Sequence, residues 1–168
     1  MPNKAIFFDR DGTLNVDVHY LHDPADFVWV DGAIEAIRWA NEHGYLVIVV
    51  TNQSGIARGY YDEAAVHHLH DWMNTELEKH NAHIDAFYYC PHHTEGKLPA
   101  YTKSCDCRKP APGMILRAIR EHDIDPAASW MFGDGARDVT AAANAGVRGV
   151  RYAGGSLCEL IRATIETS

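Results

Sequence analysis

The chain has 168 residues, and its 46% hydrophobic and 23% charged content is that of an ordinary globular protein. This length suits one buried core, so we expect a single domain over residues 1–168. A formal net charge of −8 argues against nucleic-acid binding, and the longest apolar run, residues 45–50, is too short to cross a membrane. Acidic residues near the N-terminus leave no room for a signal peptide, so we expect a cytoplasmic protein. The sequence does not show the oligomeric state, and a monomer is the default expectation.

Strands and helices alternate along the predicted elements. Residues 4–8 and 45–50 have the branched, apolar pattern of buried strands, and residues 32–43 between them have helical spacing before a stop at Gly44. The same alternation then continues with a helix over about 62–80, a strand over 86–90, a helix over about 113–121, a strand over 130–132, a helix over about 136–145 and a strand near 149–152. This order predicts an α/β fold with a doubly wound, mainly parallel sheet, in which ligands bind beyond the carboxyl ends of the strands.

Two carboxylates stand two residues apart where the first strand ends, in the segment Asp9-Arg10-Asp11-Gly12-Thr13. Adjacent carboxylates repel unless a cation lies between them, and Mg²⁺ suits this position because it takes oxygen ligands and pairs with phosphate oxygens. We therefore expect Asp9 to attack a phosphoryl group and Asp11 to act as general acid and base. Taken alone, such a pair is as often a solvated turn or a helix cap.

Three later segments supply the positive charge and the hydrogen-bond donors that phosphoryl transfer requires. Residues 51–54 (TNQS) follow the second strand and offer a hydroxyl, amides and backbone N–H groups. Lys109 offers a point charge for the reacting phosphate, and Arg108 can bind a second oxyanion through its planar fork. In residues 133–138 (GDGARD), Asp134 is the better magnesium ligand, and Asp138 is expected to orient metal-bound water or Lys109. Each segment alone also fits a turn, a solvated basic pair or the acidic first turn of a helix.

These four segments, in this order, resemble the haloacid dehalogenase-like (HAD-like) phosphatase superfamily, whose D-x-D-G-T, T-N, lysine and G-D-x-x-x-D motifs all occur between residues 4 and 152. The resemblance implies a Rossmann-like HAD fold, a phospho-aspartate intermediate and dependence on Mg²⁺. It implies that Asp9 is the nucleophile, Asp11 the acid and base, Thr51 and Lys109 the phosphate contacts, and Asp9, Asp134 and the main-chain carbonyl of Asp11 the magnesium ligands. We expect further substrate contacts from Asn52, Arg108, Arg10, Gln53 and Ser54.

A cluster of metal-ligating residue types lies in a long loop over about residues 90–107. Cys90-Pro91-His92-His93 and Cys105-Asp106-Cys107 give a C-x-H-x12-C-x-C pattern, which suits a closed tetrahedral Zn²⁺ site with no position left for water. The expected ligands are Cys90, His92, Cys105 and Cys107, although spacing alone does not separate His92 from His93. Such a zinc ion would be structural and would hold the loop that carries Arg108 and Lys109.

The chain has no insertion large enough for a cap domain, which leaves an open site. Within the superfamily, the zinc loop, the segment 107–114 (CRKPAPGM) and the segment 51–59 (TNQSGIARG) resemble the D,D-heptose 1,7-bisphosphate 7-phosphatase family. This resemblance implies removal of the 7-phosphate of a small phosphorylated sugar, D-glycero-D-manno-heptose 1,7-bisphosphate, in the ADP-heptose branch that feeds lipopolysaccharide. Two departures are Gly135, where that family commonly has lysine, and His19, where it has glycine.

Two other functions remain open from the sequence. Histidinol-phosphate phosphatase is a related family with a comparable, usually shorter zinc loop. A non-catalytic, zinc-stabilised sugar-phosphate binding domain could keep the same fold, although binding alone would not require Asp11. The remaining histidines, His70 among them, are expected to face solvent or to pack.

Overall fold

The computed structural model describes residues 2–168 and has one sheet at its centre. The sheet has five strands in the order β3-β2-β1-β4-β5, and every neighbouring pair is parallel. The strands are β1 (Lys4–Phe8), β2 (Tyr45–Asn52), β3 (Ala86–Cys90), β4 (Trp130–Gly133) and β5 (Arg148–Arg151). The predicted α/β class with a doubly wound parallel sheet is therefore confirmed.

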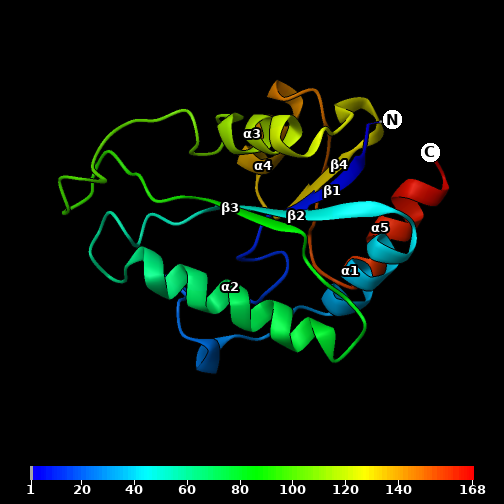
Figure 1. Ribbon diagram of the computed structural model, residues 1–168, viewed down its shortest axis with the longest axis horizontal. Helices are drawn as coiled ribbons and strands as arrows, with labels where there is room; N and C mark the ends of the chain where they lie inside the picture. The colour runs from blue at the N-terminus through cyan, green and yellow to red at the C-terminus, as the bar shows by residue number, and fades with distance from the viewer. Residues whose placement is uncertain (1) are drawn as a thin grey trace.

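Helices cover both faces of this sheet, as Figure 1 shows. Helices α1 (Ala33–Glu42), α2 (Glu63–Glu78) and α5 (Leu157–Glu166) pack on one face, and α3 (Gly113–His122) and α4 (Ala136–Asn144) pack on the other. Successive side chains of a strand point to opposite faces, so Ile6 and Phe8 of β1 enter the first core and Ala5 and Phe7 enter the second. Burial on both faces explains why β1 is apolar at four consecutive positions.

The predicted elements agree with the observed ones to within about two residues at each end, apart from one helix. Strand β2 continues beyond Val50 because Thr51 and Asn52 still pair with Tyr89 and Cys90 of β3. Helix α5 was not among the predicted elements. Its N-cap, Ser156, accepts a hydrogen bond from the backbone N–H of Glu159, and its buried residues pack in the same core as α1.

The topology brings the polar ends of separate strands to one edge. Parallel strands have their carboxyl ends on the same side, so the residues that follow β1, β2 and β4 meet there. The long segment between β3 and α3 has no helix or strand of its own, and it ends beside the same edge. None of the helices in residues 2–168 combines the length and apolar character that crossing a membrane needs.

Candidate active site

Asp9 lies directly after β1 and is paired with a buried lysine. The Nζ atom of Lys109 is 2.7 Å from Asp9 Oδ1, 2.7 Å from Asp138 Oδ1 and 2.9 Å from the carbonyl oxygen of Val50. The three charged side chains are at most 5% exposed. These hydrogen bonds use all three N–H donors of the ammonium group, so its position between the two carboxylates is fixed.

Burial has opposite effects on the two partners of this ion pair. Desolvation raises the pKa of Asp9 to about 7, although the charge of Lys109 opposes the rise. Desolvation lowers the pKa of Lys109, but the charges of Asp9 and Asp138 outweigh it, and the net pKa is raised. Lys109 is therefore a permanent cation, and a cation near Asp9 favours its nucleophilic, ionised form.

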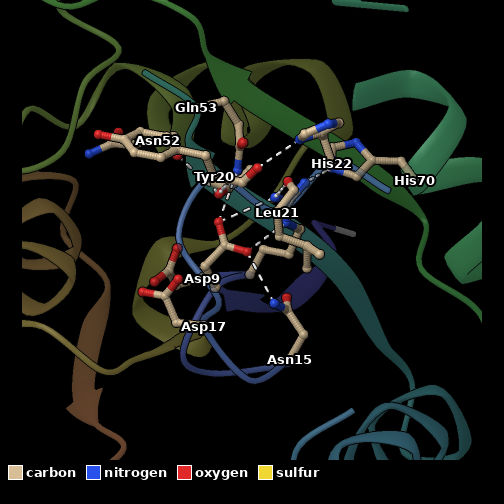
Figure 2. Close-up of polar contacts among 12 residues, drawn as sticks. Asp9, Asn15, Asp17, Tyr20, Leu21, His22, Asn52, Gln53 and His70 are labelled. Carbon is tan, nitrogen blue, oxygen red and sulfur yellow. Dashed lines mark hydrogen bonds and ion pairs between the residues drawn. The ribbon is translucent and has the colours of Figure 1, made fainter. Parts of the chain in front are cut away.

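The carboxylate of Asp11 is held by side chains from several directions. Arg10 donates to both of its oxygens, at 3.1 Å from Nε and 3.2 Å from Nη2. Asn15 Nδ2 donates to Oδ1 at 3.1 Å, and Gln53 Nε2 donates to Oδ2 at 3.2 Å. Figure 2 shows Asn15 and Gln53 on opposite sides of this network. The side chain remains 23% exposed, so it is oriented by the protein while still facing the solvent-filled site.

Arg10 differs from its expected role as a substrate contact. Its side chain has no solvent exposure, and it also donates to the carbonyl oxygen of Leu21 at 3.0 Å and contacts His70 Nε2 at 3.2 Å. His70 is 3% exposed and stacks on Phe87 at 4.2 Å between ring centroids. Because its nitrogens are used inside the protein, Arg10 orients Asp11 and does not reach the substrate. The sequence did not indicate that the Arg10 side chain points inward, because this orientation depends on a contact with His70 of α2.

Thr51 and Gln53 form a second ordered group beside Asp11. Gln53 Nε2 donates to Thr51 Oγ1 at 2.9 Å, and Gln53 Oε1 accepts from the hydroxyl of Tyr61 at 2.5 Å. Gln53 is 2% exposed, and its amide N–H groups are bonded to Asp11 and Thr51, so it positions these two side chains. Gln53 also lines the pocket, and its expected contact with substrate stays a prediction. Thr51 Oγ1 accepts the bond from Gln53 and makes only a long contact, 3.5 Å, to the carbonyl of Asn52, which leaves its hydroxyl proton free for a phosphate oxygen.

Asn52 connects the end of β2 to the backbone around Lys109. Its Oδ1 accepts from the Lys109 N–H at 2.9 Å, and its Nδ2 donates to the Lys109 carbonyl at 3.3 Å. This pair of bonds fixes the peptide that carries both Lys109 and Arg108. Ser54 and Asn52 lie together in the wall of the site pocket.

A group of carboxylates could hold a divalent cation. Oxygens of Asp9, Asp134 and Asp138 lie within 4.8 Å of one another. Both oxygens of Asp138 are used within the protein, by Lys109 at 2.7 Å and by the Gly135 N–H at 3.0 Å. Gly12 has φ +86°, and a Cβ on it would come within 2.2 Å of Asp134 Oδ2, so only glycine lets the first loop approach Asp134. This donor set of hard oxygens suits Mg²⁺.

The four expected soft ligands are also brought together. The Sγ atoms of Cys90 and Cys107 each lie 3.3 Å from Cys105 Sγ, and His92 Nδ1 lies 3.8 Å from Cys90 Sγ and 3.4 Å from Cys107 Sγ. Ligands about 2.3 Å from a tetrahedral zinc ion would be about 3.8 Å apart, close to these separations. Burial lowers the pKa of His92, which keeps the imidazole neutral as a metal ligand must be.

His93 lies outside this cluster. Its Nδ1 accepts from the backbone N–H of Glu95 at 2.9 Å, and its Nε2 lies 3.4 Å from Arg58 Nη2. Of the two histidines that the sequence left open, it is His92 whose ring nitrogen lies with the three sulfur atoms. The Cys/His group can hold a metal ion, and Arg108 and Lys109 follow directly after its last member.

The pocket at this edge has a volume of about 290 Å³ and includes residues that sequence analysis did not select. Asp9, Asp11 and residues 51–54 line it together with Asp17, His19, Tyr20, Tyr61 and Arg137. His19 and Tyr20 both have φ +55°, a left-handed conformation that favours glycine. His19 thus adopts the conformation expected of the glycine it replaces. Tyr20 packs edge-on against Tyr60 with ring centroids 4.7 Å apart, at the rim of the pocket.

Comparison with known proteins gives consistent matches. The HAD-hydrolase-like family model matches residues 106–163. The D-glycero-β-D-manno-heptose-1,7-bisphosphate 7-phosphatase of Pasteurella multocida is 51% identical over 145 residues, which are 86% of this chain and 78% of that protein. The protein of the same name from Escherichia coli K12 is 48% identical over 143 residues, 85% of this chain and 75% of that protein.

Solved structures agree with these sequence matches. A putative HAD-like phosphatase from Mesorhizobium loti aligns with a TM-score of 0.87 at 34% identity, covering 99% of this chain and 88% of that chain. The D,D-heptose 1,7-bisphosphate phosphatase from B. bronchiseptica, solved with magnesium and phosphate, aligns with a TM-score of 0.81 at 29% identity, covering 98% of this chain and 99% of that chain.

Proposed function

Because this chain belongs to the D-glycero-β-D-manno-heptose-1,7-bisphosphate 7-phosphatases of the HAD-like hydrolases, we propose that its reaction proceeds through a phosphoryl group carried on Asp9. The chain is a phosphatase, and it removes the 7-phosphate of heptose 1,7-bisphosphate in the pathway to ADP-heptose. The observation that carries the proposed mechanism is the buried Asp9–Lys109 pair, with Asp11 oriented beside it at the mouth of the pocket.

In the first step, a carboxylate oxygen of Asp9 attacks the phosphorus of the 7-phosphate, and the bond from phosphorus to the sugar oxygen breaks. One Asp9 oxygen is held by Lys109, which leaves the other available for attack. Asp11 donates a proton to the departing sugar oxygen. Lys109 and the Thr51 hydroxyl stabilise the negative charge on the phosphoryl oxygens.

In the second step, water hydrolyses the phospho-aspartate. Asp11, now ionised, accepts a proton from the water as it attacks the phosphorus, and the Asp9 carboxylate is released with inorganic phosphate. The hydrogen bonds from Arg10, Asn15 and Gln53 keep the Asp11 carboxylate directed at the site through both steps. The same side chain thus serves as acid and then as base.

We propose that Mg²⁺ is held by Asp9, Asp134 and the main-chain carbonyl of Asp11. The fit rests on the grouped carboxylate oxygens and on the close approach that Gly12 permits. When bound, Mg²⁺ neutralises the repulsion between these carboxylates and the phosphate dianion. Asp138 holds Lys109 in place from the opposite side.

We propose Zn²⁺ for the Cys/His group, with a structural role. Three thiolates and one imidazole are the soft ligands of a closed zinc site, and they leave no position for substrate. In the absence of metal, the Cys90 sulfur and burial raise the pKa of the Cys107 thiol. A bound cation would remove this penalty and fix the backbone that leads into Arg108 and Lys109.

Arg108 is proposed to bind the second phosphate of the substrate. Asn52 and Ser54 are proposed to contact the substrate from the wall of the pocket. We propose the β anomer as the preferred substrate, since the relatives are named for it. A single-domain monomer in the cytoplasm is proposed as the working form, and size-exclusion chromatography with light scattering would test its oligomeric state.

A panel assay of phosphate release tests the function directly. Both anomers of heptose 1,7-bisphosphate are compared with histidinol phosphate, with Mg²⁺ and with a chelator. We expect the β anomer to have the highest kcat/KM and the chelator to remove activity. A preference of about tenfold or more for histidinol phosphate, equal to about 1.4 kcal/mol in transition-state stabilisation, would reject the heptose assignment. Absence of phosphate release from every substrate would favour a binding protein.

A further inference from the structure

Three arginines near the active site have no acidic partner. They are Arg58 in the turn after β2, Arg108 before the catalytic lysine, and Arg137 in the first turn of α4. Within residues 2–168, none of them forms an ion pair, whereas most other arginines on the surface of this acidic chain are paired or bonded to backbone oxygens. Among residues 2–168, the side chains of these three arginines have one hydrogen-bond contact, that between Arg58 Nη2 and His93 Nε2.

Arg137 lies in the wall of the active-site pocket, together with Asp9, Thr51 and Asn52. It is three residues after Asp134, at the carboxyl end of β4, so it reaches the pocket from the side opposite to β2. Its Cγ lies 3.7 Å from the point where a Cβ on Gly135 would be, an ordinary van der Waals separation, so the arginine stem runs beside the turn that opens α4. The Arg137 side chain is exposed and is free to contact a bound molecule.

The other two arginines have unsatisfied buried nitrogens. Arg58 Nε and Arg108 Nη1 are buried without any hydrogen-bond partner, although both side chains are only half-buried overall. A buried N–H group without a partner is unfavourable, and most such groups in proteins are satisfied by protein or ligand. The charges of Arg137 and Arg58 both act on Arg108, so the three guanidinium groups lie near one another. These like charges repel one another until an anion lies between them.

In the proposed mechanism Lys109 and Thr51 serve the reacting phosphate, so the arginines are available for a second one. We infer that Arg137, acting with Arg108 and flanked by Arg58, binds the second phosphate of the substrate while the first reacts at Asp9. A guanidinium group binds two phosphate oxygens at once through parallel N–H donors, and two such groups match a phosphate dianion. This inference rests on the proposed function, and it adds a contact from α4 that none of the sequence motifs indicated.

The inference predicts which substrates depend on Arg137. The experiment compares kcat/KM for heptose 1,7-bisphosphate with kcat/KM for heptose 7-phosphate, the same sugar without the second phosphate. We expect Arg137→Ala to lower the ratio of these two values about tenfold or more, mainly by raising KM for the bisphosphate. Arg137→Glu should lower the ratio further, because it places a negative charge in the site, and Arg137→Lys should restore part of it.

Arg120→Ala is the matched control, since Arg120 is an exposed arginine on α3 outside the active-site pocket. This variant should keep the wild-type ratio. A ratio for Arg137→Ala within about twofold of wild type would overturn the inference and leave the proposed function standing. If the wild-type enzyme itself has a ratio near one, the proposed preference for a bisphosphate is wrong. The proposed site for the second phosphate is then wrong as well.

Discussion

The guanidinium group of Arg10 donates hydrogen bonds to both carboxylate oxygens of Asp11, from Nε at 3.1 Å and from Nη2 at 3.2 Å. Arg10 has no solvent exposure, so the arginine that follows the proposed nucleophile in sequence fixes the proposed acid and base from inside the protein. A planar fork with two parallel donors sets both the position and the plane of the carboxylate. Asp11 is therefore held in one orientation while it still lines the pocket.

Replacement of Arg10 by lysine should therefore impair turnover. Lysine keeps the charge but cannot bind both Asp11 oxygens and the Leu21 carbonyl with one planar group. We expect kcat to fall by about 10–100-fold, the usual effect of losing a residue that orients a catalytic group, with a smaller change in KM. Steady-state kinetics on the wild type and on Arg117→Lys, an exposed arginine on α3, provide the comparison. A wild-type kcat in Arg10→Lys would show that Asp11 does not need this contact.

His70 should make stability depend on pH. Burial, followed by the charge of Arg10, lowers the pKa of His70 well below its ordinary value of 6.5. The folded protein then binds this proton less readily than the unfolded chain, so stability is complete above pH 6.5 and is lost as the pH falls below it. The loss can reach about 1.4 kcal/mol per pH unit.

The substitution His70→Gln keeps an acceptor for Arg10 and removes the titration. We expect denaturant unfolding of this variant to depend less on pH between about 6.5 and 5 than that of the wild type. His68→Gln, an exposed histidine on the same helix, is the control and should behave as the wild type does. Equal slopes in His70→Gln and the wild type would show that His70 does not titrate in this way.

Substitution of the nucleophile should stop the reaction without unfolding the protein. Asp9→Asn keeps the size of the side chain and an acceptor for Lys109, but a neutral amide cannot form the phospho-aspartate. We expect phosphate release to fall by at least about 1,000-fold, with an unchanged circular dichroism spectrum. Asp71→Asn on the surface of α2 serves as the control. Turnover near the wild-type rate in Asp9→Asn would reject Asp9 as the nucleophile.

Magnesium affinity should depend on Asp134. Its carboxylate lies beside Asp9 and the Gly12 turn, and a neutral amide there removes one negative charge from the proposed site. We expect Asp134→Asn to raise the Mg²⁺ concentration for half-maximal activity by about tenfold or more. The measurement is a magnesium titration of activity at saturating substrate. An unchanged half-maximal concentration would place the ion elsewhere.

Removal of one zinc ligand should affect metal content, stability and activity together. We expect wild-type protein to contain about one zinc per chain by elemental analysis, and Cys105→Ser to contain much less. The melting temperature and kcat/KM should both fall, because the backbone after Cys107 carries Arg108 and Lys109. Cys158→Ser is the matched control, since this half-buried cysteine lies outside the cluster. Full activity of zinc-free protein would reject a structural zinc.

Local sequence patterns were sufficient for most of the fold. Residues 4–8 and 86–90 are short apolar runs, and their length and composition fit a buried strand better than a helix or a loop. Their predicted bounds match those of β1 and β3. Helix α5 was missed because its amphipathic pattern follows the last motif and no strand comes after it. The helix is stabilised by packing against α1, which sequence spacing alone does not reveal.

The sequence by itself determined the α/β class, the identities of Asp9, Asp11 and Asp134 as candidate catalytic and metal-binding residues, and the four possible metal ligands of the zinc loop. These depend on short motifs, in which neighbouring residues supply complementary chemistry. Only the tertiary structure decided which side chains face the pocket and which support it. It buried Arg10 behind Asp11, placed His92 and not His93 among the sulfur atoms, and brought Arg137 to the pocket.

The physical reason is that side-chain direction depends on contacts between residues far apart in the chain. Lys109 and Asp9 are 100 positions apart, and Arg10 and His70 are 60 apart. A motif shows that a charged group is present near a strand end. Burial and the partners available in the folded protein then determine whether that group binds substrate or orients another residue.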